Sequence, residues 1–146
     1  MVAPLIMAGN SVAASNVIDA TYTTVMDLAP TFIEIANATY PEDNTVMPML
    51  GESMSKFLSG ESVSVHNSQY VTILSHRGRA FLRKDKWKIA TTFGPFDEAN
   101  FELYNVVSDP GETANLAIAE PEIYAELIGI WRKKRKEVGI IIPSDL

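Results

Sequence analysis

The chain has 146 residues, of which 47% are hydrophobic and 21% charged, as expected for a globular protein of one domain, alone or with a lead-in segment. The formal net charge of −6 argues against nucleic acid as the main partner, because phosphate binding needs an excess of Lys and Arg. Cysteine is absent, which excludes disulfides and thiolate metal sites but leaves the cell compartment undetermined. No apolar run reaches the about 20 residues that a membrane-spanning helix requires.

The first forty residues predict one short strand and one helix. Val2–Ala8 is a short apolar run typical of a strand, although it contains Pro4. The helix is expected to begin at Asp27, which we interpret as its N-cap, with Pro30 in the first turn where a missing N–H is tolerated. Its apolar residues recur at helical spacing and predict one buried face, made by Leu28, Phe32, Ile35 and Ala36.

A loop over Tyr40–Pro48 separates this helix from a second, shorter one. The segment Gly51–Gly60 predicts a short helix that ends at its last glycine, with Met54, Phe57 and Leu58 facing the core. A polar loop follows at Ser64–Ser68.

The second half of the chain changes to the period of strands. Tyr70–Leu74, Arg79–Arg83, Lys86–Thr92 and Phe101–Val107 are the predicted strands, and Lys84–Asp85 is the predicted hairpin turn. Four consecutive short strands favour an antiparallel sheet.

A turn and a long helix complete the chain. In Asp109–Glu112, a proline followed by Gly111 predicts a type II turn, with the Asp109 carboxylate accepting hydrogen bonds from turn amides. The final helix is expected over Pro121–Val138, with Gly139 as its stop. Its predicted apolar stripe, which should cover the sheet, consists of Tyr124, Leu127, Ile128, Trp131 and Val138.

Two further features lie at the end of this helix. The basic cluster Arg132–Lys136 is most simply a solvated face that complements the helix dipole. Ile140–Ile142 forms an apolar tail that we expect to be exposed. The predicted fold class is therefore α+β: a four-stranded antiparallel sheet packed against a long C-terminal helix, preceded by an irregular, partly helical lead-in.

Several of these segments, in order, resemble one family. Glu102–Asn105 followed by Asp109–Leu116 resembles the C-terminal signature of the arylsulfatases, and Asp27–Ala36 and Gly51–Gly60 resemble segments nearer the end of their catalytic domain. Arg79–Ile89 is similar to a hairpin of the family but lacks the glycine at its turn. The resemblance covers roughly residues 3 to 140 and implies a lead-in segment, 1–60, followed by a C-terminal subdomain, 61–146.

The resemblance implies a parent enzyme that hydrolyses sulfate esters. Such an enzyme uses a formylglycine made from a Cys/Ser-x-Pro-x-Arg motif and a divalent metal, for which calcium is the expected identity. The nearest match here, Ser108–Glu112, has Glu in place of the essential Arg and is already explained as a turn. We therefore expect this chain to hold no catalytic residue, metal or cofactor, to be inactive alone, and to have an N-terminal catalytic domain as its partner.

One corner of the sheet could still contact an anionic ligand. His76, Arg77 and Arg79 lie near a predicted strand end, where an imidazole and two guanidinium groups could bind a sulfate or carboxylate. Three interpretations stay open: a substrate contact of a sulfatase, a non-catalytic module that binds a sulfated or anionic ligand here or on the basic helix face, and a purely structural domain with ordinary solvated side chains. His66 is a weaker candidate.

The two ends of the chain also predict an assembly state. If Met1–Asn16 and Ile140–Ile142 normally pack on a catalytic domain, the isolated chain exposes apolar surface. It should then form a homodimer or larger assembly, or else be disordered at its N-terminal end. The alternative is that both segments fold back on their own sheet.

Overall fold

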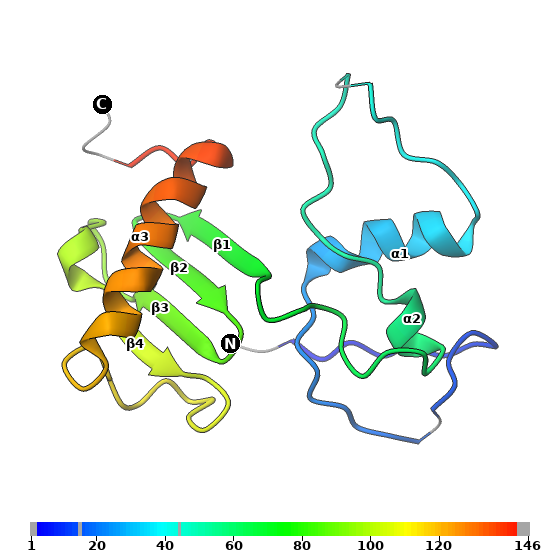
Figure 1. Ribbon diagram of the computed structural model, residues 1–146, viewed down its shortest axis with the longest axis horizontal. Coiled ribbons are helices and arrows are strands. Elements are labelled where there is room, and N and C mark those ends of the chain that lie inside the picture. The colour runs from blue at the N-terminus through cyan, green and yellow to red at the C-terminus, as the bar shows by residue number, and fades with distance from the viewer. Residues whose placement is uncertain (1–2, 15, 44, 143–146) are drawn as a thin grey trace. The chain divides into compact units, whose positions relative to one another are not determined.

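A computed structural model describes residues 3–14, 16–43 and 45–142 of the chain. The chain divides into two compact units, here called the N-terminal unit (Met1–Asn67) and the C-terminal unit (Ser68–Leu146). Figure 1 shows that strands and one long helix make up much of the C-terminal unit, whereas long irregular segments connect the helices of the N-terminal unit.

The C-terminal unit is built on the predicted antiparallel sheet. Its strands are hydrogen-bonded in the order β1-β2-β3-β4, and each antiparallel pair is formed by neighbours in the sequence. The alternation within a strand places one face inward: in β2, Ala80 and Leu82 are buried while Arg79 is exposed. The strand bounds are Val71–His76 for β1, Arg79–Lys84 for β2, Trp87–Thr91 for β3 and Glu102–Asn105 for β4.

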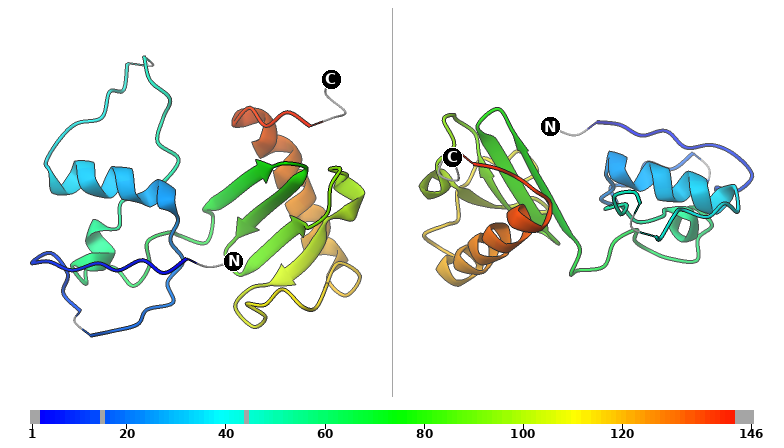
Figure 2. Two further views of the ribbon diagram at one scale, coloured as in Figure 1. Left: turned by 180° about the vertical axis from the view of Figure 1, so that it is seen from behind. Right: turned by 90° about the horizontal axis from the view of Figure 1, so that it is seen from above.

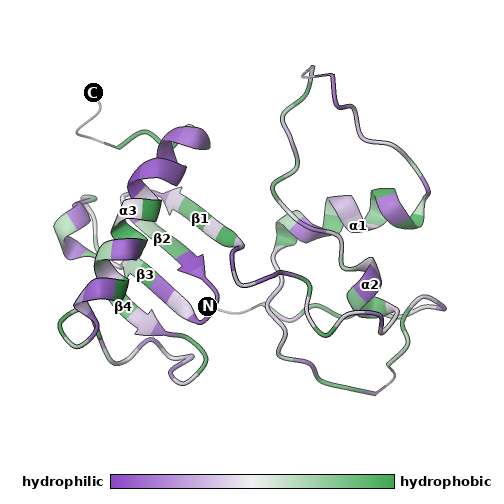
Figure 3. Cartoon of the chain, in the orientation of Figure 1, coloured by the Kyte–Doolittle hydropathy of each residue, from purple (hydrophilic) through white to green (hydrophobic). Residues whose placement is uncertain are grey.

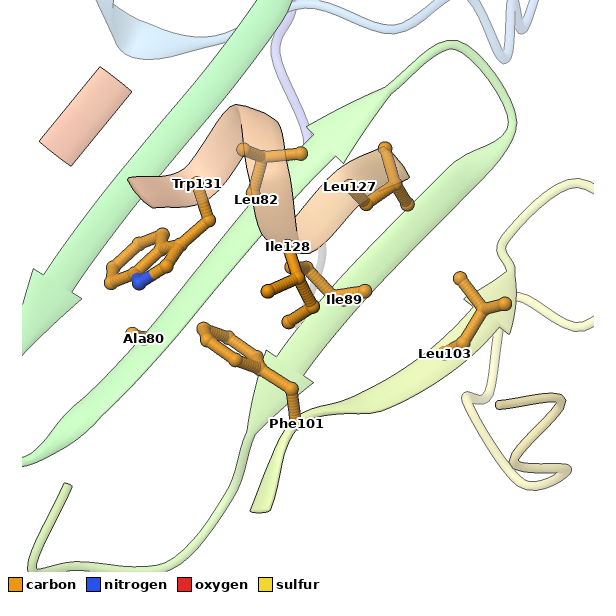
Figure 4. Close-up of a cluster of buried hydrophobic side chains, with 8 residues drawn as sticks. All are labelled: Ala80, Leu82, Ile89, Phe101, Leu103, Leu127, Ile128 and Trp131. Atoms are coloured by element: carbon orange, nitrogen blue, oxygen red, sulfur yellow. The ribbon is translucent and has the colours of Figure 1, made fainter. Parts of the chain in front are cut away.

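Helix α3, Pro121–Glu137, covers one face of this sheet (Figures 1 and 2). It begins at a proline and is followed by Gly139 with φ of 73°, as the sequence predicts. Trp131 is fully buried, with its ring centroid 5.2 Å from that of Phe101. Figure 4 shows the core between helix and sheet: Ala80, Leu82, Ile89, Phe101, Leu103, Leu127, Ile128 and Trp131. The predicted α+β class is confirmed. Of the predicted helix stripe, Tyr124, Leu127, Ile128 and Trp131 belong to or pack against the core, whereas Val138 lies just beyond the helix and outside the core.

The turn predicted at Lys84–Asp85 is wrong by one residue. Lys84 is the last residue of β2 and pairs with Trp87, so the two turn residues are Asp85 and Lys86. Asp85 has φ of 52°, a left-handed conformation that aspartate tolerates better than most residues, and this preference places it inside the turn.

The type II turn predicted at Asp109–Glu112 is also wrong. The residue with positive φ is Glu112, at 54°, and not Gly111. The Asp109 carboxylate does accept hydrogen bonds as predicted, from the amides of Thr113 at 2.7 Å and Ala114 at 2.9 Å. These bonds fix the chain beyond the turn, which explains how a residue other than glycine is held in the left-handed conformation.

The isoleucine tail corrects a third expectation. Ile142 is buried and Ile140 packs against the core, while Ile141 is 69% exposed. The tail thus folds back on its own unit in part, which follows from the chain reversal at Gly139.

The N-terminal unit contains the 3-10 turn η1 (Val25–Asp27) and the helices α1 (Leu28–Ile35) and α2 (Ser55–Leu58). The strand predicted at Val2–Ala8 is absent over its described residues, 3–8, which have no regular structure, and Val2 lies outside the described residues. Ile6 is 90% exposed there and Met7 is half-buried, so the described residues leave most of this apolar run uncovered.

The buried face predicted for α1 is wrong. Phe32 is 59% exposed and Ile35 is 53% exposed, whereas Thr31 is fully buried. Figure 3 shows that apolar residues recur along the irregular segments and helices of this unit. The helix therefore turns a polar residue inward and leaves apolar side chains of the predicted face uncovered.

Candidate functional site

The three predicted site residues lie together at one hairpin. His76 ends β1, Arg79 begins β2, and the two are cross-strand partners. Arg77 and Gly78 form the two-residue turn with φ of 50° and 76°, the positive values typical of a type I′ turn. His76, Arg77 and Arg79 are exposed, and their side chains make no hydrogen bond or ion pair with another residue in the described ranges. We call this group the hairpin tip.

A second loop at the same end of the sheet packs against the hairpin tip. This loop, 92–97, follows β3, and a Cβ atom on Gly78 would lie 3.4 Å from both Gly94 Cα and Phe96 N. A Cβ atom on Gly94 would likewise lie 3.6 Å from the Arg77 carbonyl oxygen. The backbone of the tip is thus packed against a second loop, which positions the cationic side chains more firmly than an isolated hairpin would.

The same loop also borders a surface hollow of about 390 Å³. The hollow is lined by Phe96, Asp97, Glu98, Arg132, Arg135, Lys136 and Ile142. Arg132 Nε donates to Glu98 Oε1 at 2.8 Å, and this bond raises the pKa of the arginine. We call this feature the basic hollow, because three basic side chains face two acidic ones.

A buried polar cluster, which the sequence did not predict, lies in the N-terminal unit. Asp27 is fully buried, and its carboxylate accepts hydrogen bonds from Thr24 N at 2.6 Å and Glu52 N at 2.9 Å. His66 Nε2 lies 3.0 Å from Asp27 Oδ2, and His66 Nδ1 lies 3.5 Å from Glu52 Oε2. Thr31 Oγ1 donates to the Asp27 carbonyl oxygen at 2.6 Å. The cluster ties together three segments of the chain.

Asp27 is the N-cap of α1, as the sequence predicts, but it has a helical conformation and its carboxylate makes no capping bond to that helix. The carboxylate instead accepts a hydrogen bond from Thr24 N and so completes a capping box at the start of η1. The local signal was correct in that an acidic residue lies at a helix start, but two of its partners are 25 and 39 residues away. Sequence spacing carries no signal for such contacts.

The residues that the structure describes show no arrangement that fits a sulfatase metal or formylglycine site. Ser108–Glu112 lies in a loop that contains the Asp109–Glu112 turn, and Glu112 makes an ion pair with Lys88. Among the described residues, no group of three or more Asp, Glu or His side chains is arranged to hold a metal ion. No helix in those residues is long and apolar enough to cross a membrane. What the arrangement offers chemically is cationic contact with an anion.

Comparison with known proteins adds sequence relatives. The chain is 28% identical over 135 residues to an uncharacterised sulfatase of Schizosaccharomyces pombe, covering 89% of this chain and 24% of that protein. It is 29% identical over 131 residues to arylsulfatase K of Xenopus laevis, covering 85% of this chain and 24% of that protein. The chain thus spans about a quarter of the length of these curated relatives. No family model matches it.

Solved structures share the fold. One is a protein in complex with its substrate D-glucosamine-2-N,6-O-disulfate, at TM-score 0.54 and 20% identity, covering 75% of this chain and 23% of that one. A second, from work on metabolism of glycosaminoglycans by Bacteroides thetaiotaomicron, has TM-score 0.55 and 18% identity, with coverage of 75% and 24%. The chain is therefore similar to sulfatases in sequence and shares its fold with these solved structures, and the matches together support a C-terminal sulfatase-family domain.

Proposed function

We propose that this chain is the C-terminal part of an arylsulfatase-like sulfuric ester hydrolase, without the catalytic nucleophile or metal site, and that its hairpin tip lines the substrate pocket. The observation that carries the proposal is the coverage: two sulfatases match nearly all of this chain over only about a quarter of their own length. The rest of such a protein would supply the formylglycine, the divalent metal and the surrounding Lys and His side chains.

The N-terminal unit supports a role in attachment to a larger domain. Its buried residues are mostly polar, while Ile6, Ile18 and Phe32 are at least 59% exposed. A soluble monomer normally hides such apolar side chains, so a sulfatase catalytic domain is the partner that we infer for them. In this proposal residues 1–60 are the end of that domain and residues 61–146 are the C-terminal subdomain.

The hairpin tip supports a contact with substrate. Two arginines and one histidine, whose side chains bind no other described residue, surround a single tight turn, and their donors suit the oxygens of a sulfate group. The supporting loop 92–97 also presents Phe93, which is 80% exposed and could pack on an apolar part of a sulfate ester.

Hydrolysis of an aryl sulfate tests the first half of the proposal. We expect no turnover by the purified 146-residue chain, with or without calcium, because its residues supply neither a nucleophile motif nor a metal site. Turnover that persists through further purification and is abolished by Ser108→Ala would overturn this. In the parent gene, a Cys/Ser-x-Pro-x-Arg motif upstream of this segment is the expected finding, and its absence would count against the sulfatase parent.

The second candidate is a non-catalytic module that binds a sulfated or anionic ligand. The exposed cationic side chains of the hairpin tip favour this binding module as much as they favour a substrate contact of a sulfatase. The two candidates differ in the parent protein: a module predicts saturable binding without hydrolysis, whereas a sulfatase predicts that Arg79→Gln raises KM for the sulfate ester. Lys86→Gln, a base in the turn at the other end of the sheet, is the charge-matched control.

A further inference from the structure

We infer that strand β1 is a docking edge for a second copy of this chain, and that the two β1 strands pair antiparallel about a twofold axis at Ile73. The two four-stranded sheets then form one continuous sheet. This pairing does not depend on the sulfatase proposal, because it follows from the backbone of the sheet and involves neither the hairpin tip nor any relative.

The two edges of the sheet differ in whether the chain itself covers them. β1 and β4 are the edge strands, since the strands are hydrogen-bonded in the order β1-β2-β3-β4 (Figure 1). In β4, both backbone groups of Leu103 are bonded on the outer side. The carbonyl oxygen of Leu103 accepts from Leu116 N at 2.8 Å, and its N–H donates to Asn115 Oδ1 at 3.1 Å. The segment that follows the Asp109–Glu112 turn therefore closes this edge.

The register of the first hairpin shows which groups of β1 face outward. His76 and Arg79 flank a two-residue turn, so they exchange hydrogen bonds, and every second residue of β1 counted back from His76 bonds to β2 in the same way. The remaining residues, Val71, Ile73 and Ser75, turn their N–H and C=O groups away from β2. No hydrogen bond joins these outward groups to any residue in the ranges 3–14, 16–43 and 45–142.

β1 also lacks the features by which natural sheets protect an exposed edge. Its sequence, Val-Thr-Ile-Leu-Ser-His, contains no proline, no lysine and no other residue of fixed charge. Its register with β2 is continuous from Val71 to His76, without a bulge. A flat edge of this kind presents unpaired backbone groups to which a further strand can bind.

Antiparallel self-pairing satisfies every outward group of β1 at once. With the twofold axis at Ile73, this residue faces the same residue of the second copy, and Val71 faces Ser75. All three outward residues then form hydrogen-bonded pairs, each of which exchanges two bonds. An axis at Thr72 or Leu74 would leave one of the three without a partner in β1. A strand of another protein would need a matching sequence, which a second copy supplies by symmetry.

Side chains and charge also favour a second copy. Ile73 packs against the core, so its neighbour Leu74 lies on the sheet face opposite α3, where it is 53% exposed. In this register Leu74 reaches the same leucine of the second copy diagonally. The C-terminal unit has eleven basic and eleven acidic residues, so the net charge of −6 belongs to the N-terminal unit. Two C-terminal units therefore approach without net repulsion.

The size of the contact sets the strength that we expect. β1 has six residues, and one pair of such strands buries less than the about 1,200 Å² at which standard protein interfaces begin. The dimer should therefore be weak and concentration-dependent.

Amide hydrogen exchange of the 146-residue chain at rising concentration, with the mass followed by sedimentation, tests the inference. We expect the mass to double towards millimolar concentration. The amides of Val71, Ile73 and Ser75 should then become about tenfold or more protected, because they form the new bonds. The amides of Thr72 and Leu74, which already bond to β2, should change much less.

Two variants with matched controls locate the contact. Ser75→Pro removes an outward N–H without removing a bond to β2, and should weaken self-association about tenfold or more, whereas Ser75→Ala keeps the N–H and should not. Leu74→Lys places like charges side by side at the axis and should weaken the dimer most at low salt. Its control, Phe93→Lys, adds the same charge at an 80% exposed ring in the loop 92–97. Unchanged circular dichroism establishes folding, and if Ser75→Pro unfolds, Leu74→Lys decides.

A chain that stays monomeric at every concentration would overturn the inference. So would a dimer in which these variants associate as tightly as their controls, because the contact would then lie elsewhere, as on the exposed apolar residues of the N-terminal unit. In a longer parent protein, protection of Val71, Ile73 and Ser75 in the monomer would assign the edge to another part of that protein, and would also overturn the inference.

Discussion

The two units of this chain are stabilised in different ways. The C-terminal unit encloses an apolar core in which Leu82, Ile89 and Trp131 are completely buried. In the N-terminal unit, Met54 is the one buried hydrophobic residue among those described, and the other buried positions are Asp27 and Thr31. One unit therefore gains stability from apolar burial, and the other is organised by hydrogen bonds around one carboxylate.

The two units also differ in whether their apolar side chains are buried within the unit itself. The apolar core between α3 and the sheet is enclosed within the C-terminal unit, and we expect this unit to fold by itself. The catalytic domain that we propose as partner would cover the exposed apolar residues of α1. Hydrogen bonds alone contribute little net stability, and we expect the N-terminal unit to be the less stable of the two.

The largest expected effect is on the apolar core. Trp131→Ala should lower the free energy of unfolding of the C-terminal unit by about 3–5 kcal/mol, because it empties a fully buried site packed against Phe101. Denaturant unfolding followed by far-UV circular dichroism measures it. Phe32→Ala, which removes an exposed ring of the N-terminal unit, should change the free energy of unfolding little. Comparable losses in both variants would show that apolar burial does not distinguish the two units.

The second prediction concerns the carboxylate of the N-terminal unit. Asp27→Asn should cost about 1–3 kcal/mol, since the amides of Thr24 and Glu52 would lose a charged acceptor in a buried place. Faster hydrogen exchange at these two amides is the readout. Asp19→Asn, whose carboxylate is exposed and accepts from Thr21 only, is the control. Normal protection in the Asp27 variant would show that the cluster does not organise this unit.

Two glycines should respond with opposite signs. A Cβ atom on Gly51 would overlap the carbonyl group of Met26 and lie 2.7 Å from Asp27 N, so Gly51→Ala should destabilise the N-terminal unit by about 1–3 kcal/mol. Gly129 lies within α3, and a methyl group there would meet nothing within 4 Å, so Gly129→Ala should stabilise the C-terminal unit by about 0.5–1 kcal/mol. Thermal unfolding of both variants measures the signs, and equal signs would contradict the packing described.

The smallest effect is a pH dependence at the turn after β4. Hydrogen bonds from the amides of Ala114 and Thr113 lower the pKa of Asp109 below its ordinary value of 3.8. A lowered folded-state pKa means that the stabilisation is present above pH 3.8 and is lost as the pH falls through the folded value. The drop in thermal midpoint between about pH 7 and about pH 3 should therefore be smaller in Asp109→Asn than in the unmodified chain. An equal drop in both proteins would show that the Asp109 carboxylate does not contribute to the pH dependence of the thermal midpoint.

Local patterns were enough to predict much of the C-terminal unit. Period-two alternation identified the four strands, and helical spacing identified the stripe that includes Leu127 and Trp131, because both patterns arise from burial within this unit. Turn types were less predictable, since Glu112 adopts a positive φ that its side chain disfavours and that bonds to Asp109 compensate.

The N-terminal unit escaped prediction for two physical reasons. Asp27 meets Glu52 and His66 through contacts 25 and 39 residues apart, and no local pattern encodes such distances. The apolar face of α1 has the spacing of a buried face, yet no described residue covers it. At the hairpin tip, sequence reasoning placed His76 and Arg79 together correctly, whereas the neighbouring basic hollow depends on tertiary packing of α3. The role of the tip in binding stays a prediction.

Amide hydrogen exchange, measured residue by residue on the unmodified 146-residue chain, tests the central contrast most directly. We predict slow exchange in β2, β3 and the middle of α3, close to the global free energy of unfolding, and exchange that is faster by orders of magnitude in α1. Equal protection of α1 and α3 in a monomeric sample would contradict this contrast, because it would mean that the N-terminal unit is stable without an apolar partner.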